Sequence, residues 1–409
     1  MRKSVAPDMP EKAPWRPARG VRFRVLDEQG VLFDGRSRVV YFLNTAATLL
    51  WCRIENGDAV DPGAEGMAVA AEAGPPALQA QEIIAQWLSL GLLSGPGAAA
   101  APQPPARPRT RRRSGRVVPP LGPGAIRRHY ALLRSGFELA FADAELAEAV
   151  DPTLAHLAPA DPASEPLALA IDRHRGGFRL AAGGRLLDAC RSLEEVAPLV
   201  KLHLARLAVA RFPHRGALHA GALAGADGSL LLPAASGSGK SLLAAALMAR
   251  GWHYLSDDTA LLDAQHFAVT GVPYSLTIKE GGWDVAATYF PEVLRQAVHR
   301  RPDGQRVRYL PPVLGRPNPA PGEQRVRWIV VPRFVAAAPP AEPRRIGRVE
   351  ALRLLLMQSS WVRPLDWKTI ERLIDALNGI ACWTLAYSSI AAAVAAVEDI
   401  VAEDGRARR

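Results

Sequence analysis

Cysteine is scarce in this 409-residue sequence, which holds only Cys52, Cys190 and Cys382, far apart from one another. Their spacing fits neither a disulfide framework nor a zinc site, so both are excluded and the thiols are expected to be reduced. No apolar run approaches the roughly 20 residues that span a bilayer, and residues 1–20 lack the apolar centre of a signal peptide. We therefore expect a cytoplasmic protein without a membrane partner.

Acidic residues are outnumbered by basic ones, which gives a formal net charge of +10. Much of the excess lies in one run, RPRTRRRSGR at 107–116, inside a stretch of Pro, Ala and Arg that cannot build a core. This composition predicts a solvated linker at 96–120. A basic linker leaves nucleic-acid binding open as an alternative, but the small domain before it carries few Lys or Arg on its predicted helices, which disfavours that partner.

A glycine-rich turn joins a predicted strand to a predicted helix. The stretch PAASGSGKS begins at Pro233, follows the apolar run 229–232 and precedes a helical segment at 242–250. This is the order of elements in a phosphate-binding loop, where backbone N–H groups at a helix N-terminus hold an anion. The usual pattern begins with Gly where this chain has Ala234, so the entry to the loop is expected to differ slightly. The residues predicted to contact the nucleotide here are Ser236, Gly237, Ser238, Gly239, Lys240, Ser241 and Leu242.

Lys240 is expected to reach the β- and γ-phosphates of ATP, and the Ser241 hydroxyl to complete a Mg²⁺ shell. The alternative is a glycine-rich turn with a solvated lysine. Two short motifs flank the loop: LHAG contains His219, and LSDD contains Asp257 and Asp258. The His, the loop and the Asp-Asp pair follow one another in the register found in HPr kinase and its relatives, and the chain resembles that family here.

The resemblance implies an α/β kinase domain of the HPr kinase and phosphoenolpyruvate-carboxykinase-like P-loop type at 214–402. It also implies that Asp258 is the catalytic base, that Asp257 assists Ser241 in holding Mg²⁺, and that His219 lies near the transferred phosphoryl group. The region 121–213 contains a predicted strand at 166–171 and a predicted helix at 192–212. It holds no chemistry that the sequence identifies, so we interpret it as a packing subdomain of the kinase.

The resemblance is incomplete after the Asp-Asp pair. A further acidic Mg²⁺ ligand and the Arg-bearing loop associated with the reverse, phosphorylase reaction have no clean match, so the sequence supports the kinase direction alone. Lys279, on the segment SLTIKEG, is predicted as an additional phosphate contact, with a solvent-facing lysine as the alternative. Arg306 and Arg308 are weaker candidates.

Before the linker, alternating apolar residues predict three strands, at 21–25, 31–33 and 38–43. Asp34 and Gly35 supply hairpin chemistry between the last two. Asn44 is a natural N-cap for a helix at 45–54 that Gly57 ends, and a closing helix is predicted at 78–93.

The strand and helix order at 21–95, with the sequence LNTAATLLWCRIENG at its first helix, resembles the PqqD family. That resemblance implies a small α+β, winged-helix-like domain that recognises the leader of a ribosomally made precursor peptide. An extended peptide could add to the edge of the third strand and place side chains beside the last helix. The predicted peptide-binding residues are Arg38, Val40, Tyr41, Phe42, Ile84, Trp87 and Leu88. The alternative for the three on the helix is that they are core residues.

Together these features predict a leader-binding domain tethered to a kinase, with short tails at 1–20 and 403–409. The predicted function is ATP-dependent phosphorylation of a Ser or Thr hydroxyl on the recruited precursor peptide, with Mg²⁺ as cofactor. The alternatives are a leader-binding scaffold with a nucleotide switch, and a kinase for a small hydroxylated metabolite. The sequence leaves open the acceptor, the choice of ATP or GTP, and whether the chain forms a homo-oligomer.

Overall fold

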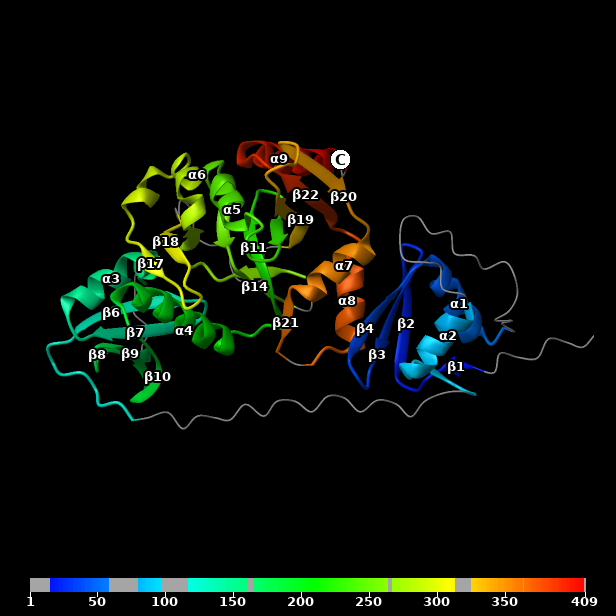
Figure 1. Cartoon of the computed structure of the whole chain (residues 1–409), viewed down its shortest axis with the longest axis horizontal. Helices are drawn as coiled ribbons and strands as arrows, with labels where there is room; N and C mark the ends of the chain where they lie inside the picture. The colour runs from blue at the N-terminus through cyan, green and yellow to red at the C-terminus, as the bar shows by residue number, and fades with distance from the viewer. Residues whose placement is uncertain are drawn as a thin grey trace, which may run out of the picture. The chain divides into compact units, whose positions relative to one another are not determined.

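The computed structural model describes residues 15–58, 80–96, 117–159, 165–263, 267–312, 325–362 and 364–407 (Figure 1). Outside these ranges lie residues 1–14 of the predicted tail at 1–20, most of the predicted linker with its arginine run, and residues 78–79 of the predicted closing helix. Contacts divide the chain into two units, each holding helices and sheets, so the fold is mixed α/β. Unit 1 comprises Met1–Thr110, Gly347–Glu350 and Pro364–Ile374, and unit 2 comprises the rest.

Unit 1 contains the three predicted strands as an antiparallel sheet in the order β2-β3-β4. These strands are β2 (Val21–Leu26), β3 (Gln29–Asp34) and β4 (Val39–Leu43). The helices are α1 (Thr45–Asn56) and α2 (Ala80–Ser89). The short strands β1 (Arg16–Pro17) and β5 (Leu93–Ser94) pair with each other, so the predicted tail at 1–20 is wrong at β1. In the part of the chain that the structure describes, β4 pairs with β3 alone and therefore forms one edge of the sheet.

The local signals at α1 are confirmed. The Asn44 side chain accepts a hydrogen bond from the Ala47 N–H at 2.9 Å, and Gly57 ends the helix at φ +78°. Both devices satisfy backbone groups that a helix end leaves unpaired. Inside the unit, the fully buried Trp51 meets the edge of Trp87 with ring centroids 5.2 Å apart, so α1 and α2 share one core.

Two later segments of the chain belong to unit 1. The Trp367 ring stacks on Phe33 with centroids 6.4 Å apart, and the Arg348 Nε donates to Asp27 at 2.7 Å. These residues lie on α8 (Trp367–Leu377) and α7 (Arg348–Met357). Nothing in the local sequence signals this assignment, because it depends on contacts across more than 300 residues of chain.

Unit 2 begins with a five-stranded sheet in the order β10-β9-β8-β7-β6. Its strands are β6 (Ile126–Leu132), β7 (Ser135–Phe141), β8 (Leu167–His174), β9 (Gly177–Ala182) and β10 (Arg185–Cys190). Two helices share its core, α3 (Ala144–Leu154) and α4 (Val196–Arg211). The strand predicted at 166–171 is confirmed by β8. The helix predicted at 192–212 divides into a 3₁₀ turn, η2 (Leu193–Glu195), and α4.

The central sheet of unit 2 has the order β15-β14-β11-β12-β19-β22-β20, and β13 and β21 also pair with β11. Its strands are β11 (Gly216–Ala224), β12 (Ser229–Pro233), β13 (His253–Ser256), β14 (Thr259–Leu262), β15 (Val269–Gly271), β19 (Val326–Phe334), β20 (Ala341–Arg345), β21 (Ser359–Trp361) and β22 (Ala381–Tyr387). Strand β19 runs parallel to both β12 and β22, so the carboxyl ends of these three strands meet at one edge.

Helices α5 (Lys240–Ala249) and α9 (Ile390–Ala407) pack on this sheet, and Figure 1 shows them beside β11, β19 and β22. Their apolar side chains share one core with those of β12, β19 and β22. Helix α9 continues to Ala407, so the predicted tail at 403–409 is helical up to that residue.

A third sheet, in the order β16-β18-β17, adjoins α6 (Trp283–Ala287). Its strands are β16 (Leu276–Lys279), β17 (His299–Arg300) and β18 (Arg306–Leu310). The remaining 3₁₀ turns are η1 (Ala155–Leu157), η3 (Glu280–Gly282) and η4 (Pro291–Arg295). No helix in the described ranges is long and apolar enough to cross a membrane.

Candidate functional site

The predicted phosphate-binding loop joins the carboxyl end of β12 to the N-terminus of α5. Gly237 has φ +92° and Gly239 has φ +86°, a backbone conformation that favours glycine. Ala234 has no positive φ, which explains why Ala replaces the Gly of the usual pattern without strain. The predicted difference at the loop entry therefore does not require a strained backbone.

A side chain and a backbone N–H from two neighbouring strands hold the loop. The Tyr387 hydroxyl donates to the Ser238 carbonyl at 3.2 Å, and the Phe334 N–H donates to the same oxygen at 3.1 Å. A Cβ on Gly239 would lie 1.9 Å from the Tyr387 Oη. The loop conformation is thus fixed by β19 and β22 as well as by its own glycines.

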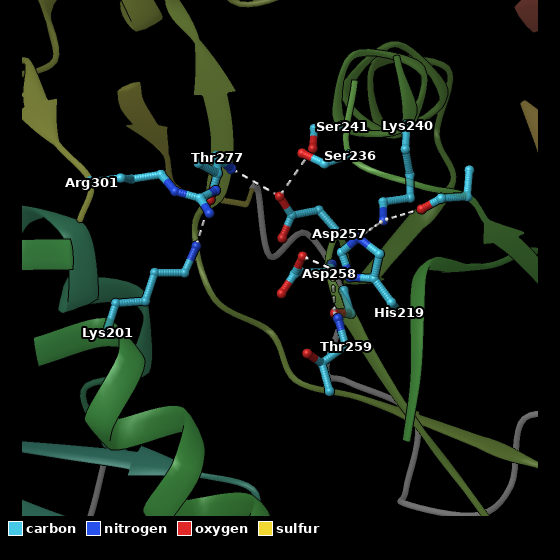
Figure 2. Close-up of polar contacts among 12 residues, drawn as sticks. Lys201, His219, Ser236, Lys240, Ser241, Asp257, Asp258, Thr259, Thr277 and Arg301 are labelled. Carbon is cyan, nitrogen blue, oxygen red and sulfur yellow. Dashed lines mark hydrogen bonds and ion pairs between the residues drawn. The ribbon is translucent and has the colours of Figure 1, made fainter. Parts of the chain in front are cut away.

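Lys240 is the first residue of α5, and its side chain is only 6% exposed. Its Nζ donates to the Ala234 carbonyl at 3.2 Å and to the His219 Nε2 at 3.0 Å (Figure 2). Burial lowers the pKa of Lys240, and the nearby carboxylates of Asp258 and Asp257 oppose that effect. An anion bound in the loop would therefore interact with the partly desolvated ammonium group of Lys240.

His219, on β11, links this lysine to the Asp-Asp motif. Its Nδ1 lies 3.2 Å from the Asp258 Oδ1, while its Nε2 accepts from Lys240. A neutral imidazole that accepts at Nε2 must carry its proton on Nδ1, so His219 donates to Asp258. The three side chains form a continuous hydrogen-bonded chain from the loop to the carboxylate.

Asp258 lies in the tight turn between β13 and β14. The backbone N–H groups of Asp258 and Thr259 donate to the Ser256 Oγ at 3.3 and 3.1 Å, which fixes the turn. Partial desolvation opposes ionisation of Asp258, but the hydrogen bond from His219 and the charges of nearby lysines outweigh it and lower the pKa. The side chain is 65% exposed, so this carboxylate is ionised and accessible.

Asp257 points the other way and is buried, at 3% exposure. Its Oδ2 accepts from the Ser241 Oγ at 3.3 Å and from the Thr277 N–H at 2.9 Å, and its Oδ1 accepts from the Tyr254 hydroxyl at 3.2 Å. Oxygen ligands of this kind suit Mg²⁺, which commonly takes one or two protein groups and completes its shell with phosphate oxygens and water. Within the described ranges no cluster of three or more His, Cys, Asp or Glu could hold a metal. The pair of Ser241 and Asp257 fits a Mg²⁺ ion that arrives with a nucleotide.

Lys279, at the end of β16, donates to the Ser236 Oγ at 2.7 Å and so reaches the loop from the sheet β16-β18-β17. Arg306 forms an ion pair with Glu280. Arg308 donates to the Val293 carbonyl at 3.1 Å and lies over the Trp283 ring. Of the three additional cations named from the sequence, Lys279 alone has a contact with the loop among those that the described residues make.

The sequence analysis missed Lys201 on α4, in the region interpreted as packing alone. Its Nζ donates to the Ser275 carbonyl at 2.9 Å and to the Thr277 Oγ1 at 2.7 Å, and it lies 4.7 Å from the centroid of the Tyr309 ring. Burial lowers the pKa of Lys201, while Asp257 and Asp258 oppose the shift. Figure 2 shows its side chain extending toward Thr277 and the Asp-Asp pair.

This contact brings a side chain from 121–213 into the hydrogen-bond network of the site, because Thr277 also donates its N–H to Asp257. A lysine at helical spacing in SLEEVAPLVKLHLARL is indistinguishable in sequence from a solvated one. Only the hydrogen bonds of Lys201 to Ser275 and Thr277 reveal its place beside the carboxylates.

The predicted peptide-binding residues fall into two groups. Val40, Tyr41 and Phe42 lie on the edge strand β4 and are half-buried. Arg38 lies just before that strand, is exposed and has φ +60°. This group therefore lies at an edge that can accept an added strand.

The structure corrects the predicted peptide-binding role of the second group. Ile84, Trp87 and Leu88 on α2 are 2%, 3% and 7% exposed and belong to the core of unit 1. Groove-lining and core residues follow the same helical spacing, so the pattern could not separate them. The core alternative holds for these residues, and a peptide on β4 would not touch them without a rearrangement of α2.

No family model matches the chain, and a search of curated proteins finds no match either. The resemblances to the PqqD family and to HPr kinase therefore rest on the motif residues named above.

Proposed function

We propose that the chain is an ATP-dependent kinase, with a P-loop domain of the HPr kinase type, that phosphorylates a Ser or Thr hydroxyl of a ribosomally synthesised precursor peptide. The observation that carries the proposal is the hydrogen-bonded chain from Lys240 through His219 to Asp258. It connects a loop suited to phosphate with an accessible carboxylate suited to accept a proton. A nucleotide switch has no need of that second group.

The transfer requires that a hydroxyl oxygen bond to the γ-phosphorus while the bond from that phosphorus to the diphosphate breaks. Asp258 takes the hydroxyl proton, and ADP leaves with the electron pair of the broken bond. Lys240 and the loop N–H groups stabilise the charge on the diphosphate, and Lys279 adds a cation at Ser236. His219 keeps Asp258 ionised and oriented. Mg²⁺, held by Ser241 and Asp257 with phosphate oxygens, would supply further charge neutralisation.

Peptide recruitment is proposed to use the edge of β4 that faces away from β3. Main-chain hydrogen bonds from an extended leader would extend the sheet, and the exposed Arg38 would favour an acidic side chain near the turn. Tethering then raises the effective concentration of the acceptor at the kinase, so a weakly bound leader is sufficient.

The function is tested with short peptides that carry Ser or Thr near their end and are encoded by reading frames beside the gene. Each candidate peptide is incubated with the full chain, ATP and Mg²⁺. A mass increase of one phosphoryl group on a single Ser or Thr supports the proposal. Nucleotide binding and leader binding without any transfer would instead support the scaffold with a nucleotide switch.

Replacing His219 by Leu, which cannot donate a hydrogen bond, is expected to move the acid limb of the rate profile to higher pH. His219 lowers the pKa of Asp258 by donating a hydrogen bond to its ionised form, so removing that donor raises the pKa toward its ordinary value. The base then becomes protonated, and activity is lost, at a higher pH than in the wild type. kcat/KM measured against pH reports the shift, and an unchanged acid limb would contradict the assigned role of His219.

Replacing residues of β4 by Pro is expected to weaken leader binding. Alternate N–H groups of an edge strand point outward. One of the two variants, Val40→Pro and Tyr41→Pro, therefore removes an outward donor, and the other removes a hydrogen bond to β3. The variant that loses the outward N–H is identified by its smaller loss of thermal stability. We expect that variant to weaken leader binding about tenfold or more. Fluorescence anisotropy of a labelled leader measures this. Wild-type binding by both folded variants would refute β4 as the docking edge.

A further inference from the structure

Phe334 is an exposed aromatic residue beside the phosphate-binding loop. Among the described residues it is 48% exposed, and the other large exposed apolar side chains there are aliphatic. It ends β19, and its N–H bonds to the Ser238 carbonyl in the loop. A ring of this size exposed next to a polar site is not explained by the core of unit 2.

The topology places Phe334 where a ligand of the loop would extend. Strands β12, β19 and β22 are parallel neighbours, and the loop, Phe334 and Tyr387 stand at their carboxyl ends. Ligands of α/β sheets bind outside this edge. The catalytic groups His219 and Asp258 lie on the other side of β12, on β11 and in the turn before β14. The acceptor is thereby assigned to the β11 side, and the rest of the nucleotide to the β19 side.

The ring is also held in place. Tyr387 packs against it edge-on, with centroids 5.8 Å apart and an interplanar angle of 68°, and the Val335 N–H donates to the Tyr387 carbonyl at 2.9 Å. A Cβ built on Gly239 would lie 3.5 Å from the Phe334 Cβ, so the side chain starts in contact with the loop. A fixed aromatic face loses little conformational entropy when a flat ligand stacks on it.

We propose that Phe334 is the stacking platform for the nucleobase of the bound nucleoside triphosphate. The inference rests on the proposed function, because it assumes that the loop holds the phosphates of a nucleotide. Every nucleobase offers a π-face, so stacking strengthens binding without choosing between adenine and guanine. Phe334 is thus assigned to affinity for the base, while Lys240 is assigned to the phosphates.

The test compares ATP, GTP and inorganic tripolyphosphate, each with Mg²⁺, by calorimetry on the full chain. We expect Phe334→Ala to raise the Kd for both nucleotides about tenfold or more and to leave tripolyphosphate binding unchanged. Phe334→Trp should bind nucleotides as the wild type does. Leu49→Ala, which truncates an exposed apolar side chain in unit 1, is the control and should change nothing.

Four outcomes overturn the platform. If Phe334→Ala weakens tripolyphosphate as much as ATP, the residue only supports the loop. If it binds ATP normally but loses affinity for the acceptor peptide, the ring serves the acceptor. If the wild type binds neither ATP nor tripolyphosphate, the proposed function itself fails and the platform fails with it. Binding of tripolyphosphate and ATP with equal affinity by the wild type and Phe334→Ala would refute the platform alone.

Discussion

Replacing Asp258 by Asn is expected to slow phosphoryl transfer by about 100-fold or more, the range typical of a lost general base. Asn keeps the size of the side chain and can still accept a hydrogen bond from His219, so the turn between β13 and β14 should persist. What it loses is the ability to take the hydroxyl proton. Binding of MgATP should therefore remain within about twofold of the wild type.

Calorimetry with ATP and a transfer assay on the same preparation separate the two effects. Asp227→Asn is the matched control, because it removes an exposed carboxylate from the turn between β11 and β12, and it should transfer at the wild-type rate. Near-normal turnover in Asp258→Asn would show that another group accepts the proton. Loss of ATP binding would show instead that Asp258 acts on the nucleotide and not on the acceptor.

Much of the loop and of unit 1 could be predicted from the sequence, because their determinants are adjacent in the chain. The turn from β12 into α5 needs glycine where φ is positive, and Gly237 and Gly239 provide it. The ends of α1 depend on Asn44 and Gly57, which satisfy backbone groups only a few residues away. Local determinants of this kind can be predicted from the sequence without knowledge of the fold.

Features that depend on distant packing could not be predicted. Lys201 gains its place beside the carboxylates from contacts to a strand more than 70 residues later. Trp87 has the spacing of a groove residue and of a core residue alike, and only its contact with Trp51 decides between them. Phe334 ends a largely apolar strand, VRWIVVPRF, and the sequence of that strand does not show that this side chain is exposed. In each case the deciding partner is absent from the local sequence.

Replacing Gly239 by Ala is expected to abolish MgATP binding at concentrations that saturate the wild type. The added Cβ would lie 1.9 Å from the Tyr387 Oη and 3.0 Å from its ring carbon, so the loop and β22 must separate. The backbone at φ +86° adds a left-handed strain of about 1–2 kcal/mol for any residue with a Cβ. Together these displace the N–H groups that would hold the phosphates, while the core of unit 2 stays intact.

The two causes can be separated because only one involves Tyr387. Tyr387→Phe removes the oxygen that the Cβ would meet but not the backbone strain. Gly239→Ala combined with Tyr387→Phe should therefore recover part of the ATP affinity. Tyr387→Phe alone should lose little ATP affinity. Gly281→Ala is the control, since a Cβ there meets nothing within 4 Å and its φ is not positive. Calorimetry measures the four proteins, and thermal unfolding checks that each is folded. Wild-type affinity in Gly239→Ala would mean that the loop does not hold phosphate in the conformation described, and the assignment of a nucleotide to it would fall.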